Sequence, residues 1–431
     1  TASVGTAPNV CTDTFTITVT VNPKPIISDF TPSICSEQTF TITPATAGTD
    51  LVPLGTTYTW TVASPTGITG ATDQASAQTS ISQTLTNTTE GELDVVYTVT
   101  ATAGIAPNSC TDIFTITVTV NPLPIINDRL LSICSQDTFT VTPTTVTPEI
   151  VPTGTTYTWT VVAPAGITGA SDEATSQTSI SQTLANTTNA PIDVVYTVTA
   201  SVGTSPNICT DTFTITVTVN PIPTVTVNSP TECEGTLATV TATPVVAGSY
   251  DYVWTVPSGP NPGNVASFTT TVAGVYSVII TDTVTGCFST SASGTVTINP
   301  NPTVTVNSPS VCDGVAATVT ATPGVAGSYD YVWTVPSGPN PGNVASFTTT
   351  TPGVYSVVIT DTVTGCFSTS ASGTVTINPN PIVTVNSPTV CSGDLATLIA
   401  TPTTAGTYDY AWTVPSTISN PGNVASFTTT E

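Results

Sequence analysis

The dipeptide Asn-Pro recurs along the chain at spacings that leave little freedom in how the chain can fold. It begins at Asn22, Asn121, Asn220, Asn299 and Asn378, so the intervals are 99, 99, 79 and 79 residues. A fixed period of this kind indicates a repeat architecture, in which each repeat is one structural unit. The expected organisation is a partial long repeat (1–23), two full long repeats (24–122 and 123–221), two full short repeats (222–300 and 301–379) and a partial short repeat (380–431).

The repeats are close copies of one another. The stretch SYDYVWTVPSGPNPGNVASFTTT begins at Ser249 and again at Ser328. Residues 1–23 match the last part of a long repeat, and we expect them to form its C-terminal strand. Residues 380–431 match the first two-thirds of a short repeat. We therefore expect the array to continue in both directions.

Within each repeat the pattern is that of β-strands. Apolar residues alternate with threonine from Phe114 to Val120 and again from Phe213 to Val219, which is the period of a half-buried strand. Proline and glycine cluster between such runs, as at 258–263, and no segment has a helical period. About seven strands fit into 79 residues. The expected fold class is all-β, a linear array of immunoglobulin-like or PKD-like β-sandwich domains.

Two aromatic positions support a sandwich with one core per repeat. Tyr-x-Trp occurs once in every repeat that contains this strand, and the tryptophans are Trp60, Trp159, Trp254, Trp333 and Trp412. The penultimate strand of each full repeat carries a tyrosine: Tyr97, Tyr196, Tyr276 or Tyr355. Strand alternation turns these rings to one side of the sheet, so we expect them to fill the cores.

The charge composition excludes several functions. The net charge is −24, and Lys24 and Arg129 are the only cations. A nucleic-acid partner requires many cations, so none is expected. No apolar run approaches the roughly 20 residues of a membrane span, so no membrane insertion is expected in this segment. There is no histidine, and we expect no catalytic residues, no metal site and no cofactor. Calcium between domains is the alternative, although no Asp-rich loop of a calcium-binding type occurs. Isolated carboxylates such as Asp251, Asp282, Asp313, Asp330 and Asp361 are expected to be caps, turns and surface charge.

Ten cysteines occur at regular spacings, a pattern typical of disulfides in an oxidising compartment. Each full repeat has one cysteine before its second strand and one at the start of its last strand. In order, the candidates are Cys35 and Cys110, Cys134 and Cys209, Cys233 and Cys287, and Cys312 and Cys366. Pairing within each repeat is the simplest scheme.

The topology of a sandwich favours a second scheme, because the A–B and F–G turns lie at opposite ends of a domain. A strand of about 10 residues separates these ends by roughly 30 Å, whereas a disulfide needs Cα atoms within about 7 Å. The bottom of one domain faces the top of the next. Bonds across junctions would then be Cys35–Cys209, Cys134–Cys287 and Cys233–Cys366. Both schemes remain open from the sequence.

The short repeats carry a set of motifs that resembles a known family. They have Cys-x-Gly before the second strand, Gly-x-Tyr-Ser-Val on the penultimate strand, Thr-Gly-Cys at the last hairpin and Thr-Val-x-Ile-Asn-Pro at the end. This resembles the PKD-like and immunoglobulin-like repeats of very long bacterial surface adhesins. The type IX secretion system exports these adhesins, and those of the SprB type serve gliding motility. The resemblance covers the whole chain.

The resemblance implies an extracellular, cell-surface location and a structural role. The chain would be a filament or stalk that spaces or presents adhesive regions. Its partners would be neighbouring repeats of the same chain, and surface polysaccharide or other cells. The alternative is a spacer or a carbohydrate-binding module in a secreted polysaccharide-degrading enzyme. Asp-Thr-Val at 282–284 and 361–363 resembles the O-glycan acceptor motif of such bacteria, which makes Thr283 and Thr362 candidate O-glycosylation sites.

Overall fold

In the computed structural model, which describes residues 1–430, all regular secondary structure is β-strand. Within these residues no helix exists that could cross a membrane. The described chain separates into two compact units. The first contains residues 1–225, 244–252 and 279–290, and the second contains 226–243, 253–278 and the residues from Ser291 onwards. The all-β expectation is confirmed.

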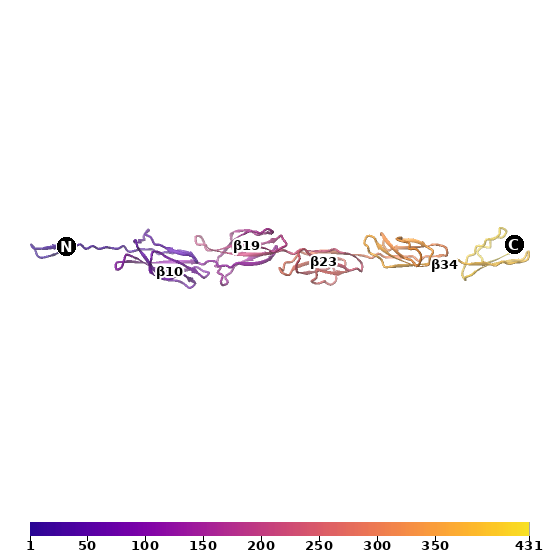
Figure 1. Cartoon of the computed structure of the whole chain (residues 1–431), viewed down its shortest axis with the longest axis horizontal. Coiled ribbons are helices and arrows are strands. Elements are labelled where there is room, and N and C mark those ends of the chain that lie inside the picture. The colour runs from indigo at the N-terminus through magenta and orange to yellow at the C-terminus, as the bar shows by residue number, and fades with distance from the viewer. Residues whose placement is uncertain (431) are drawn as a thin grey trace. The chain divides into compact units, whose positions relative to one another are not determined.

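The first long repeat, which contains the strand labelled β10 in Figure 1, is a sandwich with one large sheet and two small ones. Its strands are β3 (Ser33–Cys35), β4 (Thr39–Ile42), β5 (Thr57–Ala63), β6 (Ile68–Thr69), β7 (Gln74–Gln78), β8 (Ile81–Thr84), β9 (Thr86–Asn87), β10 (Leu93–Ala103) and β11 (Cys110–Asn121). The large sheet has the order β3-β11-β10-β5-β7, and β4–β8 and β6–β9 form the opposite layer.

The second long repeat has the same arrangement. Its strands are β12 (Arg129–Cys134), β13 (Thr138–Val141), β14 (Thr156–Val161), β15 (Ile167–Thr168), β16 (Glu173–Gln177), β17 (Ile180–Thr183), β18 (Ala185–Asn186), β19 (Ile192–Val202) and β20 (Cys209–Asn220). The large sheet runs β12-β20-β19-β14-β16.

Alternation along β10 and β11 builds the core of the first long repeat. Their antiparallel register places Tyr97 opposite Ile116 and Val99 opposite Phe114, and all four side chains are buried. Threonines occupy the intervening positions and face outward, so Thr98 lies opposite Thr115. This sheet face is therefore made polar by threonine hydroxyl groups and not by charged side chains. Trp60 and Tyr97 lie in one hydrophobic cluster, as expected from the sequence.

The short repeats are seven-stranded, as their length indicated. The first has β21 (Val225–Val227), β22 (Thr231–Cys233), β23 (Ala238–Pro244), β24 (Tyr250–Thr255), β25 (Ser267–Thr270), β26 (Gly274–Asp282) and β27 (Ala292–Asn299). The second has β28 (Val304–Val306), β29 (Ser310–Cys312), β30 (Ala317–Pro323), β31 (Tyr329–Thr334), β32 (Ser346–Thr349), β33 (Gly353–Asp361) and β34 (Ala371–Asn378). In the second, sheet β29-β34-β33-β31 faces sheet β28-β30-β32.

An aromatic stack fills the core of the second short repeat. The ring centroid of Phe347 lies 5.0 Å from that of Trp333 and 5.6 Å from that of Tyr355. The indole Nε1 of Trp333 donates a hydrogen bond to the carbonyl oxygen of Val344. The tryptophan therefore joins the two sheets and also satisfies its polar atom inside the core.

The two partial repeats depart from the expected strand pattern. A hairpin of β1 (Ala2–Val4) and β2 (Cys11–Asp13) is followed by residues 14–21, which form no strand. The predicted C-terminal strand is therefore wrong over these residues, because no neighbouring strand is present to complete its hydrogen-bond ladder. Residues 380–430 form only the sheet β35 (Val383–Val385), β36 (Ala396–Pro402) and β37 (Ser426–Thr429). Trp412 is consequently only half-buried.

The core role of tryptophan can be tested with two adjacent residues on one strand. Trp333 is 2% exposed, whereas Val332, on the other face of β31, is 64% exposed. Trp333→Ala should destabilise residues 301–379 by about 3–5 kcal/mol, because it empties the core. Val332→Ala should stay within roughly 0.5 kcal/mol of wild type. Hydrogen exchange of this repeat, followed by mass spectrometry, measures both; equal effects would contradict the assigned core.

Candidate functional site: the repeat junctions

A parallel pairing with the last strand positions one cysteine of each full repeat; the partner is the first strand of a long repeat and the second strand of a short repeat. β3 pairs with β11 so that Cys35 lies opposite Asn121, and β12 pairs with β20 so that Cys134 lies opposite Asn220. The short repeats place Cys233 opposite Asn299 and Cys312 opposite Asn378. These asparagines are the Asn-Pro markers at which the chain leaves each repeat. The cysteine before the second strand is therefore held beside the exit of the chain.

The other cysteine of a long repeat lies at the far end of the same last strand. Cys110 begins β11, and Asn121, which faces Cys35, ends it. Eleven residue steps of strand separate these ends by about 36 Å. A disulfide requires Cα atoms within about 7 Å. Pairing within the repeat is therefore sterically excluded.

Three disulfides join cysteines of successive repeats: Cys35–Cys209, Cys134–Cys287 and Cys233–Cys366. Each has a Cα–Cα distance of 5.6 Å. The structure thus has the pairing across junctions, and the simpler scheme within repeats is wrong. The free cysteines among the described residues are Cys11, Cys110, Cys312 and Cys391.

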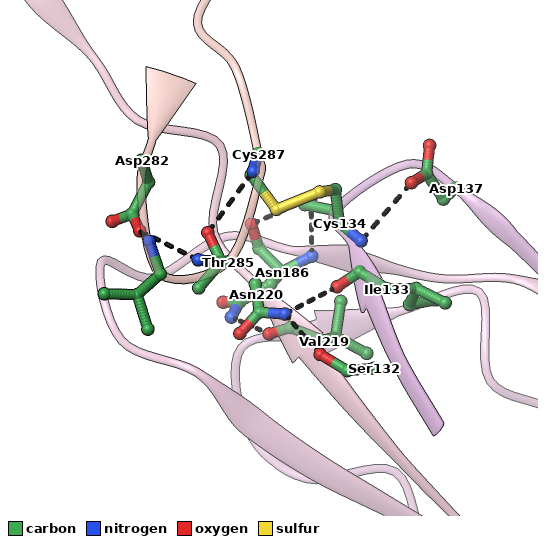
Figure 2. Close-up of a disulfide and its surroundings, with 12 residues drawn as sticks. Ser132, Ile133, Cys134, Asp137, Asn186, Val219, Asn220, Asp282, Thr285 and Cys287 are labelled. Atoms are coloured by element: carbon green, nitrogen blue, oxygen red, sulfur yellow. Dashed lines mark hydrogen bonds between the residues drawn. A yellow bond between two sulfur atoms is a disulfide. The ribbon is translucent and has the colours of Figure 1, made fainter. Parts of the chain in front are cut away.

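Figure 2 shows how the second long repeat holds Cys134 in place. The side-chain amide of Asn220 donates hydrogen bonds to the Ser132 hydroxyl, at 2.8 Å, and to the Ile133 carbonyl, at 3.1 Å. Its backbone carbonyl accepts a hydrogen bond from the N–H of Ser135, at 2.7 Å. Asn220 therefore ties the last strand to both sides of Cys134. The sequence showed Asn220 only as a repeat marker and gave no reason for this role.

A tight turn after β26 presents Cys287 from the following repeat. The Asp282 carboxylate accepts hydrogen bonds from the backbone N–H groups of Val284 and Thr285, at 2.8 and 2.9 Å. These bonds, with that of Thr285 the strongest influence, hold the pKa of Asp282 below its ordinary value. The residues 279–290 that contain this hairpin pack into the same compact unit as the preceding long repeat. Cys287 is fully buried there.

The other junctions use the same parts. The N–H of the residue after each cysteine donates to an asparagine carbonyl, from Ser36 to Asn121 and from Glu234 to Asn299, both at 2.8 Å. Asp361 caps the turn before Cys366 as Asp282 caps the earlier one. Asn301, in the connector between the short repeats, donates its side-chain amide to the Glu234 carbonyl. The junction is therefore a repeated construction.

The two candidate glycosylation sites lie on these junction hairpins. Thr283 and Thr362 are exposed. Their hydroxyls donate to the carbonyl oxygens of Ser249, at 3.2 Å, and of Ser328, at 3.1 Å. The hydroxyls are accessible at the surface, and modification of either threonine stays a prediction.

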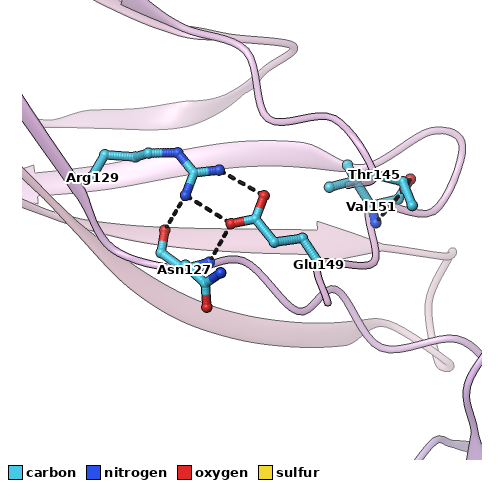
Figure 3. Close-up of polar contacts among 5 residues, drawn as sticks. All are labelled: Asn127, Arg129, Thr145, Glu149 and Val151. Carbon is cyan, nitrogen blue, oxygen red and sulfur yellow. Dashed lines mark hydrogen bonds and ion pairs between the residues drawn. The ribbon is translucent and has the colours of Figure 1, made fainter. Parts of the chain in front are cut away.

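One buried ion pair was not anticipated from the sequence. The guanidinium of Arg129 binds both carboxylate oxygens of Glu149 at 2.7 Å, and Glu149 also accepts the N–H of Asn127 (Figure 3). The hydrogen bonds from Arg129 lower the pKa of Glu149. The first long repeat has Phe30 and Asp50 at the positions of this pair. The sequence carried one signal of this pair: the two long repeats differ at both of its positions, so that the arginine and the glutamate occur together.

This pair links Arg129 on β12 to Glu149 within one repeat. Glu149 is 6% exposed and fully engaged with its partners. Among the described residues no group of three cysteine, aspartate or glutamate side chains is arranged to hold a metal ion. The candidate functional site among the described residues is the set of disulfide-linked repeat junctions.

The chain is similar to known domains over parts of its length. The PKD-like domain model matches residues 32–124 and 131–223. No curated protein matches the sequence. A three-domain immunoglobulin fragment of titin, an E-to-A variant, is 14% identical with a TM-score of 0.30, over 59% of this chain and 96% of the fragment. Domains EC1–4 of Drosophila N-cadherin are 11% identical with a TM-score of 0.23, over 81% of this chain and all of that one.

The disulfide pattern can be checked by mapping peptides without reduction. Because trypsin has almost no cleavage sites here, chymotrypsin or pepsin should be used. We expect peptides that link Cys134 to Cys287 and Cys233 to Cys366. After reduction the far-ultraviolet circular dichroism should stay largely unchanged, since each full repeat has its own core. A peptide that links Cys233 to Cys287 would overturn the assignment.

The ion pair makes a prediction about acid stability. Because the pKa of Glu149 is lower in the folded state, its contribution is present above the ordinary glutamate pKa and is lost as pH falls through the folded value. Arg129→Phe should cost about 3 kcal/mol at neutral pH, because it leaves a buried charge without its partner. Urea denaturation of the whole chain should show one shifted transition, and that transition should respond less to acid.

A matched double variant separates the ion pair from simple packing. Arg129→Phe combined with Glu149→Asp restores the residues that the first long repeat has at these positions. We expect it to recover much of the lost stability. If the double variant is no more stable than Arg129→Phe alone, the stranded carboxylate is not the cause of the loss.

Proposed function

We propose that this chain is a non-catalytic structural spacer, a segment of the stalk of an extracellular bacterial surface adhesin. The observation that carries the proposal is that three consecutive junctions have the same covalent bond. A bond within a domain stabilises that domain, whereas a bond between domains restricts their relative motion. Restricting the relative motion of domains at successive junctions in this way suits a protein that has to keep a fixed length.

The local construction of the junctions supports a spacer. Each of these junctions has two covalent connections, the polypeptide and the disulfide, so it cannot hinge as a single flexible linker does. The connectors contain Pro300 and Pro302, and proline fixes φ and biases the residue before it to extended conformations. The hydrogen bond from Asn301 to Glu234 adds a further restraint.

The parallel pairing of first and last strands in the long repeats also suits a part that bears load. The chain enters each long repeat near its first strand and leaves from its last, and these strands run parallel. When no disulfide diverts the force, tension between entry and exit slides the two strands past each other and loads their hydrogen bonds together. Peeling an antiparallel hairpin, in contrast, breaks one bond at a time.

The adhesin assignment rests on the PKD-like matches, on the motifs of the short repeats and on charge. The disulfide-bonded sandwich domains indicate an extracellular location. A net charge of −24 keeps long acidic segments soluble and separate from one another. Export by the type IX system and a part in gliding motility belong to this proposal. The proposed partners are neighbouring repeats, with adhesion to cells or polysaccharide mediated elsewhere in the protein.

A binding assay distinguishes the spacer from a carbohydrate-binding module. We expect purified chain to remain in the supernatant with insoluble cellulose, chitin or xylan, and to release no reducing sugar from them. Binding to one of these polymers would favour a module of a polysaccharide-degrading enzyme.

A replacement experiment on cells tests the spacer directly. Residues 24–379 in the parent protein are either deleted or replaced by unrelated immunoglobulin domains of the same number. A spacer predicts that adhesion falls after deletion and is restored by replacement. Loss of adhesion in both would mean that specific surfaces of these repeats take part in binding.

A further inference from the structure

We propose that the junction disulfides form a continuous covalent path that carries tension past the folded domains, so that pulling on the chain does not unfold the repeats between the bonds. This deepens the proposed spacer function, on which its biological use rests. The physical claim itself depends only on which cysteines are joined.

The path can be traced from one end to the other. It follows the backbone from Thr1 to Cys35 and crosses to Cys209 through the first disulfide. It then follows the backbone to Cys233 and crosses to Cys366 through the third. The two crossings bypass sequence separations of 174 and 133 residues. Most of the chain therefore lies off the shortest covalent route between the termini.

The backbone on this route already has little slack. Between Cys209 and Cys233 the chain contains β20, of 12 residues, followed by β21 and β22. A strand advances about 3.3 Å per residue, and a fully stretched chain reaches at most about 3.3–3.6 Å per residue. The route therefore becomes taut after a small extension.

The second disulfide belongs to a different, interleaved route. From Cys110 the backbone runs through β11 and β12 to Cys134, crosses to Cys287, and continues through β27 to Cys312. Cys110 and Cys312 are both free. The segments that complete the cores connect the two routes. For example, 36–109 runs from Cys35 on the first route to Cys110 on the second, and 234–286 runs from Cys233 to Cys287.

This connectivity removes the mechanical reason for a domain to unfold. Force favours the unfolded state over the folded one in proportion to the length that unfolding releases. Where the ends of a domain are already joined by a taut covalent route, unfolding its core releases almost no length. Tension then does little work on the core, however marginal a domain of 79 residues is by itself.

Single-molecule force spectroscopy on the whole chain, held at its two termini, tests the proposal. The four free cysteines are changed to serine to prevent other cross-links. Oxidised protein should show no domain-sized unfolding steps beyond those from the residues before Cys35 and after Cys366. Full reduction should add unfolding steps and about 1,000 Å of extension, because it releases the spans of 174 and 133 residues.

Two matched variants, each lacking one disulfide, make the test specific. Cys35→Ser with Cys209→Ser interrupts the shortest route and should lengthen the chain under oxidising conditions, on the order of 400 Å. Cys134→Ser with Cys287→Ser removes a disulfide from another junction but leaves that route complete, so the limiting extension should not change. A disulfide that acts only by stabilising domains predicts similar effects for both variants.

The proposal is overturned if oxidised wild-type protein releases domain-sized lengths from the bypassed spans, or if the two variants lengthen equally. These outcomes are independent of the spacer function, since the measurement uses isolated protein and no adhesive partner. If the chain passes this test and yet binds polysaccharide, the covalent path is supported and the spacer function is rejected.

Discussion

The parallel ladder between the cysteine-bearing strand and the last strand of each full repeat is the interaction on which the junctions depend. It sets the A–B cysteine opposite the asparagine at which the chain leaves the domain, as with Cys134 and Asn220. A shift of one residue would turn this side chain to the other face of the sheet. The asparagine amide and carbonyl then fix the segment around the cysteine. Every cross-junction bond starts from this register.

Core and junction use different chemistry and can vary separately. The cores rest on alternating apolar residues and on aromatic groups such as Trp333, Phe347 and Tyr355. The junctions rest on asparagine, aspartate, proline and cysteine. The pair Arg129–Glu149, which replaces Phe30 and Asp50 of the first long repeat, shows how one repeat can change its interior polar contacts. The junction beside it keeps the common construction.

A disulfide between two domains has a different effect from a disulfide within one domain. A bond within a domain restricts the unfolded chain of that domain. The bonds here, such as Cys35–Cys209, close a loop that contains parts of two domains. Each bond joins the end at which the chain leaves one domain to the last hairpin of the next domain. Stability of the single domain is then left to its core, and the covalent bonds act on the array. The low charge of the repeats and their threonine-covered sheets fit a surface that remains solvated.

The sequence alone determined the all-β class and the buried positions of Trp60, Trp159, Trp254 and Trp333, because strand alternation is a local signal. It limited the disulfides to two schemes, and sandwich topology favoured the bonds across junctions without excluding the other scheme, since cysteine spacing is the same in both. Only the tertiary structure decided the choice, because the distance from Cys35 to Cys110 or to Cys209 depends on strand register and on how one repeat meets the next. Residues 14–21, where the sequence predicted a strand, pair with no strand among the described residues, and a strand exists only where a neighbour completes its hydrogen bonds.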